Sequence, residues 1–304
     1  MKIIDLISNP AFFRGAVQPF VRMTPGLLDF YRQNENWLIR SNCPSGMQIV
    51  MCTDASAMEI SLQFGKAARE VFTTDVQIGG KLLTFDGAGP HRLELSGAKQ
   101  TVVIHLPHLV EIENFELKVN AAATVEAVSE NRAKLLICGD SILQGMTCSS
   151  PGRASVALTA GELDMVLHNT SVGGAIMQPV PVQETLKLGK AGDIAIVGFG
   201  INDAAHLTDA ELFRERTAKV LEHLAGFAGK AFIITPIPAA VDAEQNRELY
   251  SQMIRDEQKR FPQVTLIEGA SFFPADASLF VDKLHPNDQG MQIYAQGLIK
   301  AIRE

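Results

Sequence analysis

The chain has 304 residues, of which 46% are hydrophobic and 20% are charged, and its formal net charge at pH 7 is −7. A chain of this length and hydrophobicity can bury a substantial core and forms one large domain or two ordinary ones. The acidic balance and the lack of a dense basic run disfavour binding to a nucleic-acid backbone. No apolar run approaches the length of about 18 residues that a membrane span needs.

The N-terminus and the cysteines bear on the cellular compartment. Residues 1–10 hold a short apolar patch that Asp5 interrupts, without a small-residue cleavage site, so we expect no signal peptide. The cysteines show neither metal-ligand nor disulfide-framework spacing; they are Cys43, Cys52, Cys138 and Cys148. These features predict a protein of the reducing cytoplasm.

Short segments of β-forming residues dominate the first part of the chain. Their regular spacing, with Gly, Pro or Asp between several of them, is typical of an antiparallel sandwich. The alternation in Arg92-Leu-Glu-Leu95 directs one face inward and the other to solvent. We therefore predict a β-sandwich domain, jelly-roll-like, over residues 1–130, with strands at residues 47–53, 58–64, 92–96, 101–106 and 115–119.

After residue 133 the pattern becomes strand, loop and helix in repetition. Near-continuous apolar strands of this kind suit a parallel sheet that is covered by helices on both faces. The sequence predicts a three-layer, flavodoxin-like α/β domain over residues 131–304, with five parallel strands at residues 135–138, 165–168, 194–199, 232–235 and 264–267.

Three of the intervening helices are predicted in detail. Thr208 and Glu211 form the pattern of a capping box that opens a helix over residues 208–224. A mostly polar helix is expected over residues 244–261, where the following proline ends it. The last helix is expected over residues 289–302.

A serine directly follows the first predicted parallel strand, in Gly139-Asp140-Ser141. A serine hydroxyl becomes a good nucleophile when a base takes its proton, and histidine has a suitable pKa. Near the C-terminus, Asp282-Lys-Leu-His285 offers a histidine base and a carboxylate that can orient it. The alternative for this pair is a surface aspartate beside a helix-capping histidine.

Two further polar signals follow the second and third parallel strands. Attack on an ester carbonyl builds an oxyanion, which needs two or three fixed donors. The backbone N–H groups of Ser141 and Gly174 and the side-chain amide of Asn202 are candidates. The alternatives are an ordinary βα turn at Gly173-Gly174 and a helix cap or turn at Asn202. These signals can converge because ligands bind at the carboxyl ends of parallel strands.

Residues 134–304 resemble the SGNH (GDSL-type) hydrolase superfamily, because they contain its four motif blocks in order. The blocks are Gly139-Asp140-Ser141, Gly174, Gly200-Ile201-Asn202-Asp203 and Asp282-Lys-Leu-His285-Pro-Asn. The resemblance implies that Ser141 is the nucleophile, that His285 is the base and that Asp282 is its partner. It further implies that Gly174 and Asn202 are oxyanion donors; Gly174 is preferred to Gly173 because the family's block often reads asparagine, four residues, then glycine, as from Asn169. No metal or cofactor is implied.

Residues 1–130 are similar, more loosely, to the β-sandwich that precedes some bacterial SGNH esterases, on residues 30–32, 51–54 and 104–107. Several such relatives are carbohydrate acetylesterases. The resemblance thus implies a serine esterase that removes short acyl groups, in particular acetyl, from an acetylated oligosaccharide, without nucleic acid, membrane or cofactor as partner. The alternatives are a lipid or thioester acylhydrolase of the same superfamily and a carbohydrate-binding protein whose enzyme domain is inactive.

Several other residues allow two interpretations. Trp37 suits a sugar-stacking platform, but we expect a core or domain-interface residue. His206 could line the site, but we expect a surface turn. His105 and His108 lack acidic partners at metal-ligand spacing, so we expect no metal there. The loop over residues 235–242 contains two prolines and is expected to rim the site.

Overall fold

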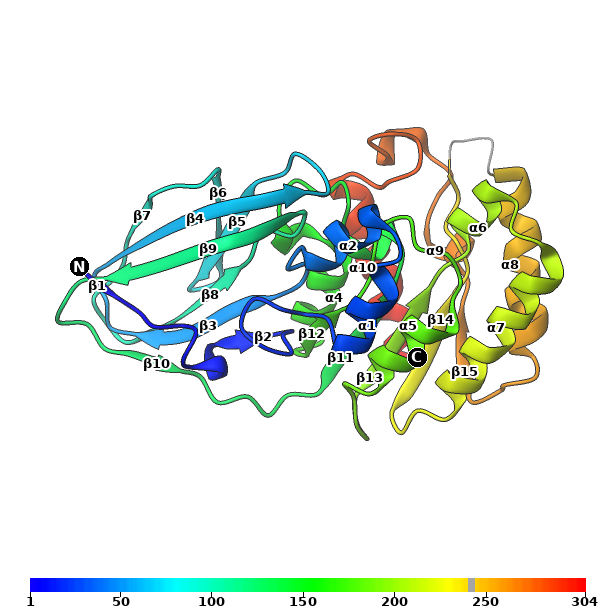
Figure 1. Cartoon of the computed structure of the whole chain (residues 1–304), viewed down its shortest axis with the longest axis horizontal. Coiled ribbons are helices and arrows are strands. Elements are labelled where there is room, and N and C mark those ends of the chain that lie inside the picture. The colour runs from blue at the N-terminus through cyan, green and yellow to red at the C-terminus, as the bar shows by residue number, and fades with distance from the viewer. Residues whose placement is uncertain (240–243) are drawn as a thin grey trace.

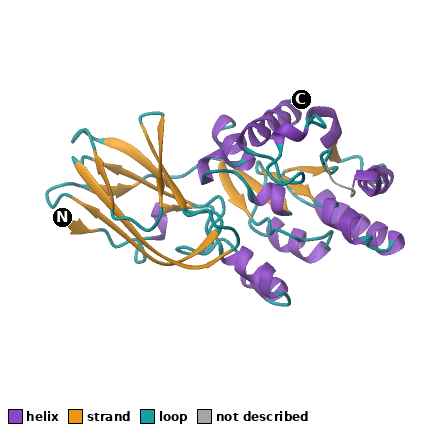
Figure 2. Ribbon diagram, turned by 90° about the horizontal axis from the view of Figure 1, so that it is seen from above, coloured by secondary structure: helices purple, strands orange, loops and turns teal. Residues whose placement is uncertain are grey.

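The computed structural model describes residues 1–239 and 244–304 and consists of two parts that lie side by side (Figure 1). Antiparallel sheets occupy the N-terminal part, and a parallel sheet with helices occupies the C-terminal part (Figure 2). The predicted fold class, a flavodoxin-like α/β domain after an antiparallel sandwich, is confirmed.

Two antiparallel sheets form the N-terminal part. The first has the order β1-β9-β4-β7, with β1 (Lys2–Ile3), β4 (Ala57–Ala67), β7 (His91–Glu94) and β9 (Val110–Val119). The second has the order β10-β3-β8-β5-β6, and β2 pairs with β3; its strands are β2 (Phe13–Arg14), β3 (Gln48–Thr53), β5 (Thr73–Ile78), β6 (Lys81–Asp86), β8 (Gln100–His105) and β10 (Val125–Ala127). Buried side chains fill the space between the sheets, among them Met51, Met58, Ile60, Ile104 and Leu117.

The five strands predicted in this part correspond to β3, β4, β7, β8 and β9, but the hairpin of β5 and β6 was missed. A polar residue points into the structure from β5 and breaks the expected pattern. Asp75 is fully buried, and its carboxylate accepts hydrogen bonds from the Thr84 hydroxyl at 2.6 Å and the Gly152 N–H at 2.7 Å. Gly79 and Gly80, both with positive φ, make the hairpin turn.

The C-terminal sheet is parallel throughout and has the order β12-β11-β13-β14-β15. Its strands are β11 (Lys134–Gly139), β12 (Val166–Asn169), β13 (Ile194–Gly198), β14 (Lys230–Ile234) and β15 (Val264–Ile267). All five carboxyl ends therefore meet at one edge, where open α/β folds bind their ligands.

Helices cover both faces of this sheet, as Figure 2 shows from above. One face packs against α1 (Pro25–Tyr31), α5 (Pro179–Leu186), α7 (Ala210–Ala225) and α8 (Glu244–Gln258). The other packs against α3 (Ser141–Gln144), α4 (Ser155–Glu162), α9 (Gly269–Phe272) and α10 (Asp288–Arg303). The remaining helical segments are α2 (Glu35–Asn42), α6 (Ile201–His206), η1 (Pro10–Phe12), η2 (Pro151–Arg153) and η3 (Ala277–Leu279). Within the described chain, none of the helices has the length and apolar character needed to cross a bilayer.

Two helix ends differ from the prediction. Asp209, and not Thr208, caps α7: its carboxylate accepts hydrogen bonds from the N–H groups of Glu211 at 3.1 Å and Leu212 at 3.0 Å. A charged cap also interacts favourably with the helix dipole, so it displaces the expected capping box. The helix α8 ends at Gln258 because the chain then closes a tighter turn, in which the Phe261 N–H donates to the Gln258 carbonyl at 2.8 Å.

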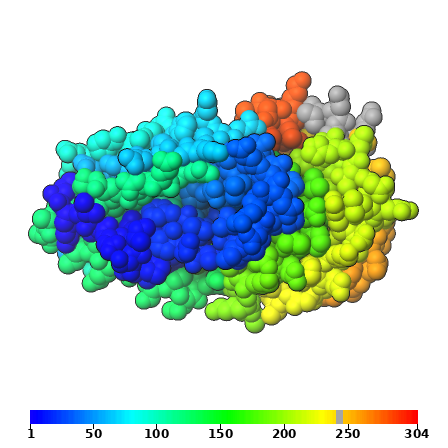
Figure 3. Space-filling model, viewed as in Figure 1, coloured from blue at the N-terminus to red at the C-terminus, as the bar shows by residue number. Residues whose placement is uncertain are grey.

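The helices α1 and α2 were not expected from the sequence. Both precede the sandwich strands β3–β10. The helix α1 packs on α5 of the α/β part, where Leu27 and Tyr31 join the core beside the parallel sheet, whereas α2 contacts α1 and the sandwich strands β4 and β9. In the space-filling view the blue segment that contains α1 and α2 lies at the junction of the two parts (Figure 3). The fully buried guanidinium of Arg22 joins them, because it donates to the carbonyls of Cys43 at 2.6 Å and Asn169 at 2.7 Å.

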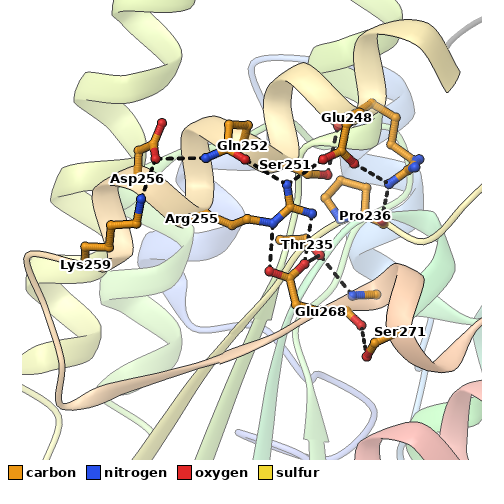
Figure 4. A network of polar contacts seen from close by, with 12 residues as sticks. Thr235, Pro236, Glu248, Ser251, Gln252, Arg255, Asp256, Lys259, Glu268 and Ser271 are labelled. Atoms are coloured by element: carbon orange, nitrogen blue, oxygen red, sulfur yellow. Dashed lines mark hydrogen bonds and ion pairs between the residues drawn. The ribbon is translucent and has the colours of Figure 1, made fainter.

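A polar network fixes α8 to the ends of β14 and β15 (Figure 4). Arg255 donates two hydrogen bonds to the carboxylate of Glu268, at 2.7 and 3.0 Å. Glu268 also accepts from the Thr235 hydroxyl at 3.0 Å, and that hydroxyl accepts from the Gly269 N–H at 2.9 Å. The network thus anchors the start of the loop predicted to rim the site; residues 240–242 of that loop lie outside the described residues.

Candidate active site

The structure brings the predicted site residues to the carboxyl edge of the parallel sheet. Ser141 follows β11, Gly174 follows β12 and Asn202 lies in α6 after β13. His285 and Asp282 come from the loop that leads into α10.

The turn between β11 and α3 fixes Ser141. Gly139 has no room for a side chain, since a Cβ there would lie 2.5 Å from both the Gly198 carbonyl oxygen and the Leu143 side chain. The Asp140 carboxylate accepts a hydrogen bond from the Ile142 N–H at 2.9 Å and so caps α3. Ser141 therefore occupies the first position of this helix and is 4% exposed.

Ser141, His285 and Asp282 form a continuous hydrogen-bonded chain. The Ser141 hydroxyl lies 2.8 Å from Nε2 of His285, and Nδ1 of His285 lies 2.8 and 2.9 Å from the two oxygens of Asp282. The loop folds back at Lys283, whose φ of 65° is in the left-handed region. The Val281 N–H donates to the His285 carbonyl at 2.9 Å and closes the loop.

Burial, more than the charges around it, keeps His285 in the form of a base. Burial lowers the pKa of His285; Asp282 opposes this shift, whereas Arg69 and Arg40 add to it, and the pKa lies below the ordinary value for histidine. For Asp282, burial acts to raise the pKa, but hydrogen bonds from the backbone and ring of His285 outweigh it and the pKa is lowered. A neutral imidazole beside an ionised carboxylate can accept a proton at Nε2.

Each of the three predicted oxyanion donors keeps an N–H group that no described residue accepts. The backbone N–H groups of Ser141 and Gly174 have no hydrogen-bond acceptor among the described residues. The Asn202 amide donates one hydrogen bond to the Ala175 carbonyl at 2.9 Å, which leaves its second N–H. By contrast, the Gly173 N–H donates to Oε1 of Gln144 at 2.7 Å, which favours Gly174 over Gly173 as the donor.

Two buried carboxyl groups accept backbone hydrogen bonds that fix the segments carrying these donors. The Asp203 carboxylate accepts a hydrogen bond from the Met177 N–H at 2.8 Å and so connects α6 to the loop that carries Gly174. Burial raises the pKa of Asp203, and burial raises the pKa of Asp140 to about 7. These groups hold the positions of Asn202 and Ser141, respectively, on the two neighbouring strand ends.

Two arginines from the N-terminal part reach the site, and neither was expected from the sequence. Nη1 of Arg40, in α2, donates to the Gly173 carbonyl at 2.8 Å. Nη2 of Arg69, which follows β4, lies 3.3 Å from the Asp282 carboxylate. Figure 1 shows the end of β4 reaching the loop before α10. No local pattern marks these residues, because their positions depend on how the sandwich packs on the α/β part.

Trp37 lies at the edge of the site and in the domain interface. It is partly buried and stacks on Phe30, with a distance of 6.2 Å between ring centroids. Its indole Nε1 would lie 3.6 Å from a Cβ added at Gly174. Trp37 therefore packs against the core, as expected, while its polar edge lies near the candidate oxyanion donor.

The other histidines are not part of this arrangement. His206 is exposed at the end of α6. His108 is buried, with Nε2 3.1 Å from both the Gly145 carbonyl and Sγ of Cys148, and His105 is buried beside Gln48. In the part of the chain that the structure describes, no group of three or more His, Cys, Asp or Glu side chains could hold a metal ion.

The fold and the site geometry define an enzyme of the acylhydrolase type. Residues 137–293 match the model of the GDSL-like lipase/acylhydrolase family, so the chain belongs to this family. This match confirms the prediction that the chain is an ester hydrolase of the SGNH (GDSL) type. No curated protein matches the sequence.

Solved structures share the fold over most of the chain. The salicylyl-acyltransferase SsfX3 from a tetracycline biosynthetic pathway has a TM-score of 0.78 at 18% identity, covering 99% of this chain and 96% of that chain. A putative GDSL-like lipase from Bacteroides ovatus has a TM-score of 0.80 at 18% identity, covering 99% and 97%. A family-two carbohydrate esterase from Clostridium thermocellum, in complex with cellohexaose, has a TM-score of 0.64 at 14% identity, covering 85% and 92%. At these identities the likeness shows the fold alone.

Proposed function

We propose that this protein is a serine esterase that removes short acyl groups, in particular acetyl, from carbohydrate hydroxyls through an acyl-Ser141 intermediate. The single observation that carries the proposal is the chain from Ser141 Oγ through His285 to Asp282, with contacts of 2.8 Å at each end of the imidazole. A serine, a histidine and a carboxylate in this order form the arrangement that activates a hydroxyl for acyl transfer.

The mechanism follows from this geometry in two steps. Nε2 of His285 takes the hydroxyl proton while Oγ of Ser141 attacks the ester carbonyl carbon. The carbonyl oxygen becomes an oxyanion that accepts hydrogen bonds from the N–H groups of Ser141, Gly174 and Asn202. The protonated His285 then donates its proton to the departing alcohol oxygen, and the acyl group remains on Ser141. Water attacks the acyl-enzyme in the same way and releases the acid.

The carbohydrate part of the proposal has two supports. The fold over 85% of the chain is like that of a carbohydrate esterase solved with cellohexaose. A tryptophan edge lies beside Gly174, and aromatic side chains with one polar edge suit sugar surfaces that are partly apolar.

Acyl transfer to an acceptor other than water is a second candidate function. The fold matches an acyltransferase over 99% of the chain. The same acyl-Ser141 intermediate would serve both reactions, since a second hydroxyl could replace water in the last step. Product analysis in the presence of a sugar acceptor separates the two: hydrolysis yields free acid, and transfer yields a new ester.

A chain-length series of p-nitrophenyl esters, beside acetylated xylo- and manno-oligosaccharides, tests the proposal. We expect the highest kcat/KM with the acetyl ester, and release of acetate from at least one oligosaccharide. The Ser141→Ala variant is the control for background hydrolysis. Preference for long acyl chains would instead indicate a lipid acylhydrolase, and lack of turnover on every ester would indicate a binding protein.

A further inference from the structure

We propose that Arg40 and Arg69 form a carboxylate-binding subsite beside Ser141, so that the enzyme prefers esters that carry a carboxylate. This inference rests on the proposed esterase function and names the charge of its substrate.

The two guanidinium groups converge on the site from separate segments. Arg40 donates to the Gly173 carbonyl at 2.8 Å, and its Nη1 would lie 2.9 Å from a Cβ added at Gly174. Arg69 contacts the Asp282 carboxylate at 3.3 Å. Both lower the pKa of His285, and the pKa of Arg40 is lowered by burial and then by the charge of Arg69. The two cations therefore lie close to each other and to the base.

The protein itself compensates this positive charge only in part. Asp282 is the one carboxylate within the described chain that pairs with either arginine, and it is also engaged by the ring and backbone of His285. Arg40 is partly buried and makes no ion pair with any described residue. A partly buried cation without a counterion is costly, so a substrate anion would complete the arrangement.

The geometry of Arg40 favours a carboxylate as that anion. A guanidinium has five N–H donors in a planar fork that matches a carboxylate, and the Gly173 carbonyl engages one nitrogen of Arg40. The candidate oxyanion site already has donors from Ser141, Gly174 and Asn202. Arg40 therefore lies next to those donors, where it can bind a charged group on the same substrate. The carboxylate could belong to the alcohol, as in an acidic sugar, or to the acyl group, as in a dicarboxylic half-ester.

Pairs of esters that differ in one charge test this subsite. The pair 4-acetoxybenzoate and 4-acetoxybenzamide places the carboxylate on the alcohol. The pair 4-nitrophenyl hydrogen adipate and 4-nitrophenyl adipamate places it on the acyl group. Each kcat/KM is divided by the rate of hydroxide-catalysed hydrolysis of the same ester, so that the ratio within a pair reports recognition of the charge.

We expect the wild-type protein to prefer the carboxylate member of one pair by about 10-fold or more at low salt, as for a hydrogen bond to a charged group. The preference should fall as ionic strength rises. Arg40→Gln should bring the ratio to about 1, and Arg40→Lys should lower it less because lysine keeps the charge without the fork. Arg69→Gln should also lower it, whereas Arg260→Gln, which removes an exposed arginine after α8, should not.

The outcomes separate this inference from the proposed function. Turnover of p-nitrophenyl acetate with ratios near 1 for both pairs would overturn the subsite and leave the esterase standing. A strong preference that survives Arg40→Gln or high salt would also overturn it. Lack of turnover on every ester would refute the esterase itself. A variant whose structure is merely disturbed would have a lower kcat/KM for both esters of a pair alike, so their ratio would be unchanged.

Discussion

The role of the Asp282 carboxylate can be tested by replacing it with asparagine. In the structure this carboxylate accepts hydrogen bonds from both Nδ1 and the backbone N–H of His285, at 2.8–2.9 Å. When His285 takes the serine proton, it becomes an imidazolium that the carboxylate stabilises. An amide lacks this charge and can hold the ring in the wrong tautomer. Asp282→Asn should therefore lower kcat with little change in KM.

The contact distance sets the size of the effect. At 2.8 Å and an effective dielectric constant of about 20, the attraction between imidazolium and carboxylate is about 6 kcal/mol. The Asp282 side chain is 37% exposed, so solvent weakens this attraction. We therefore expect Asp282→Asn to lose about 3–6 kcal/mol of transition-state stabilisation, which corresponds to about 10²- to 10⁴-fold in kcat.

The assay is steady-state hydrolysis of p-nitrophenyl acetate across substrate concentration. Asp29→Asn, which alters an exposed carboxylate in an ion pair with Arg32, is the matched control and should be neutral. Thermal unfolding should be nearly unchanged in both variants because both side chains lie at the surface. Near-normal kcat in Asp282→Asn would mean that the carboxylate does not assist the base, and the site would reduce to the pair of Ser141 and His285.

Three further outcomes follow from the structure. Asn202→Ala should lower kcat about 10²- to 10³-fold with little change in KM, as for one oxyanion donor; an effect on KM alone would assign it to substrate binding. The acid limb of kcat/KM should lie below the ordinary pKa of histidine, and Arg69→Gln should move it to higher pH, because loss of the positive charge favours protonated His285; an unmoved limb in a pH profile would contradict this. Arg255→Met should lower the free energy of unfolding by about 1–3 kcal/mol, since Glu268 loses two hydrogen bonds; denaturant unfolding with an unchanged midpoint would show that the network is not needed.

The parallel sheet and the triad candidates could be predicted because their signals are local in sequence. Strands such as 134–139 are nearly all apolar, and each site residue follows such a strand or lies within three residues of its partner. The turn chemistry at Gly139 is also local: the glycine is required because a neighbouring strand and helix leave no space. The structure places these residues together, but their catalytic roles remain predictions until they are tested.

Features that depend on packing between distant segments could not be predicted. The strand β5 was missed because the buried Asp75 interrupts its alternation, and its partners, Thr84 and Gly152, come from other elements. Arg40 and Arg69 reach the site only because the N-terminal part packs against the carboxyl edge of the parallel sheet. The capping box at Thr208 was wrong since a neighbouring aspartate competes for the same N–H groups.

In the proposed reaction Ser141 carries the acyl group. Labelling with diisopropyl fluorophosphate, followed by mass spectrometry of the intact protein and its peptides, tests it most directly. We expect one adduct, on the peptide that contains Ser141. Ser141→Ala should give no adduct, and its kcat should be lowered about 10⁴-fold or more. An adduct on another residue, or a Ser141→Ala variant that retains more than about a tenth of wild-type activity, would show that Ser141 is not the nucleophile.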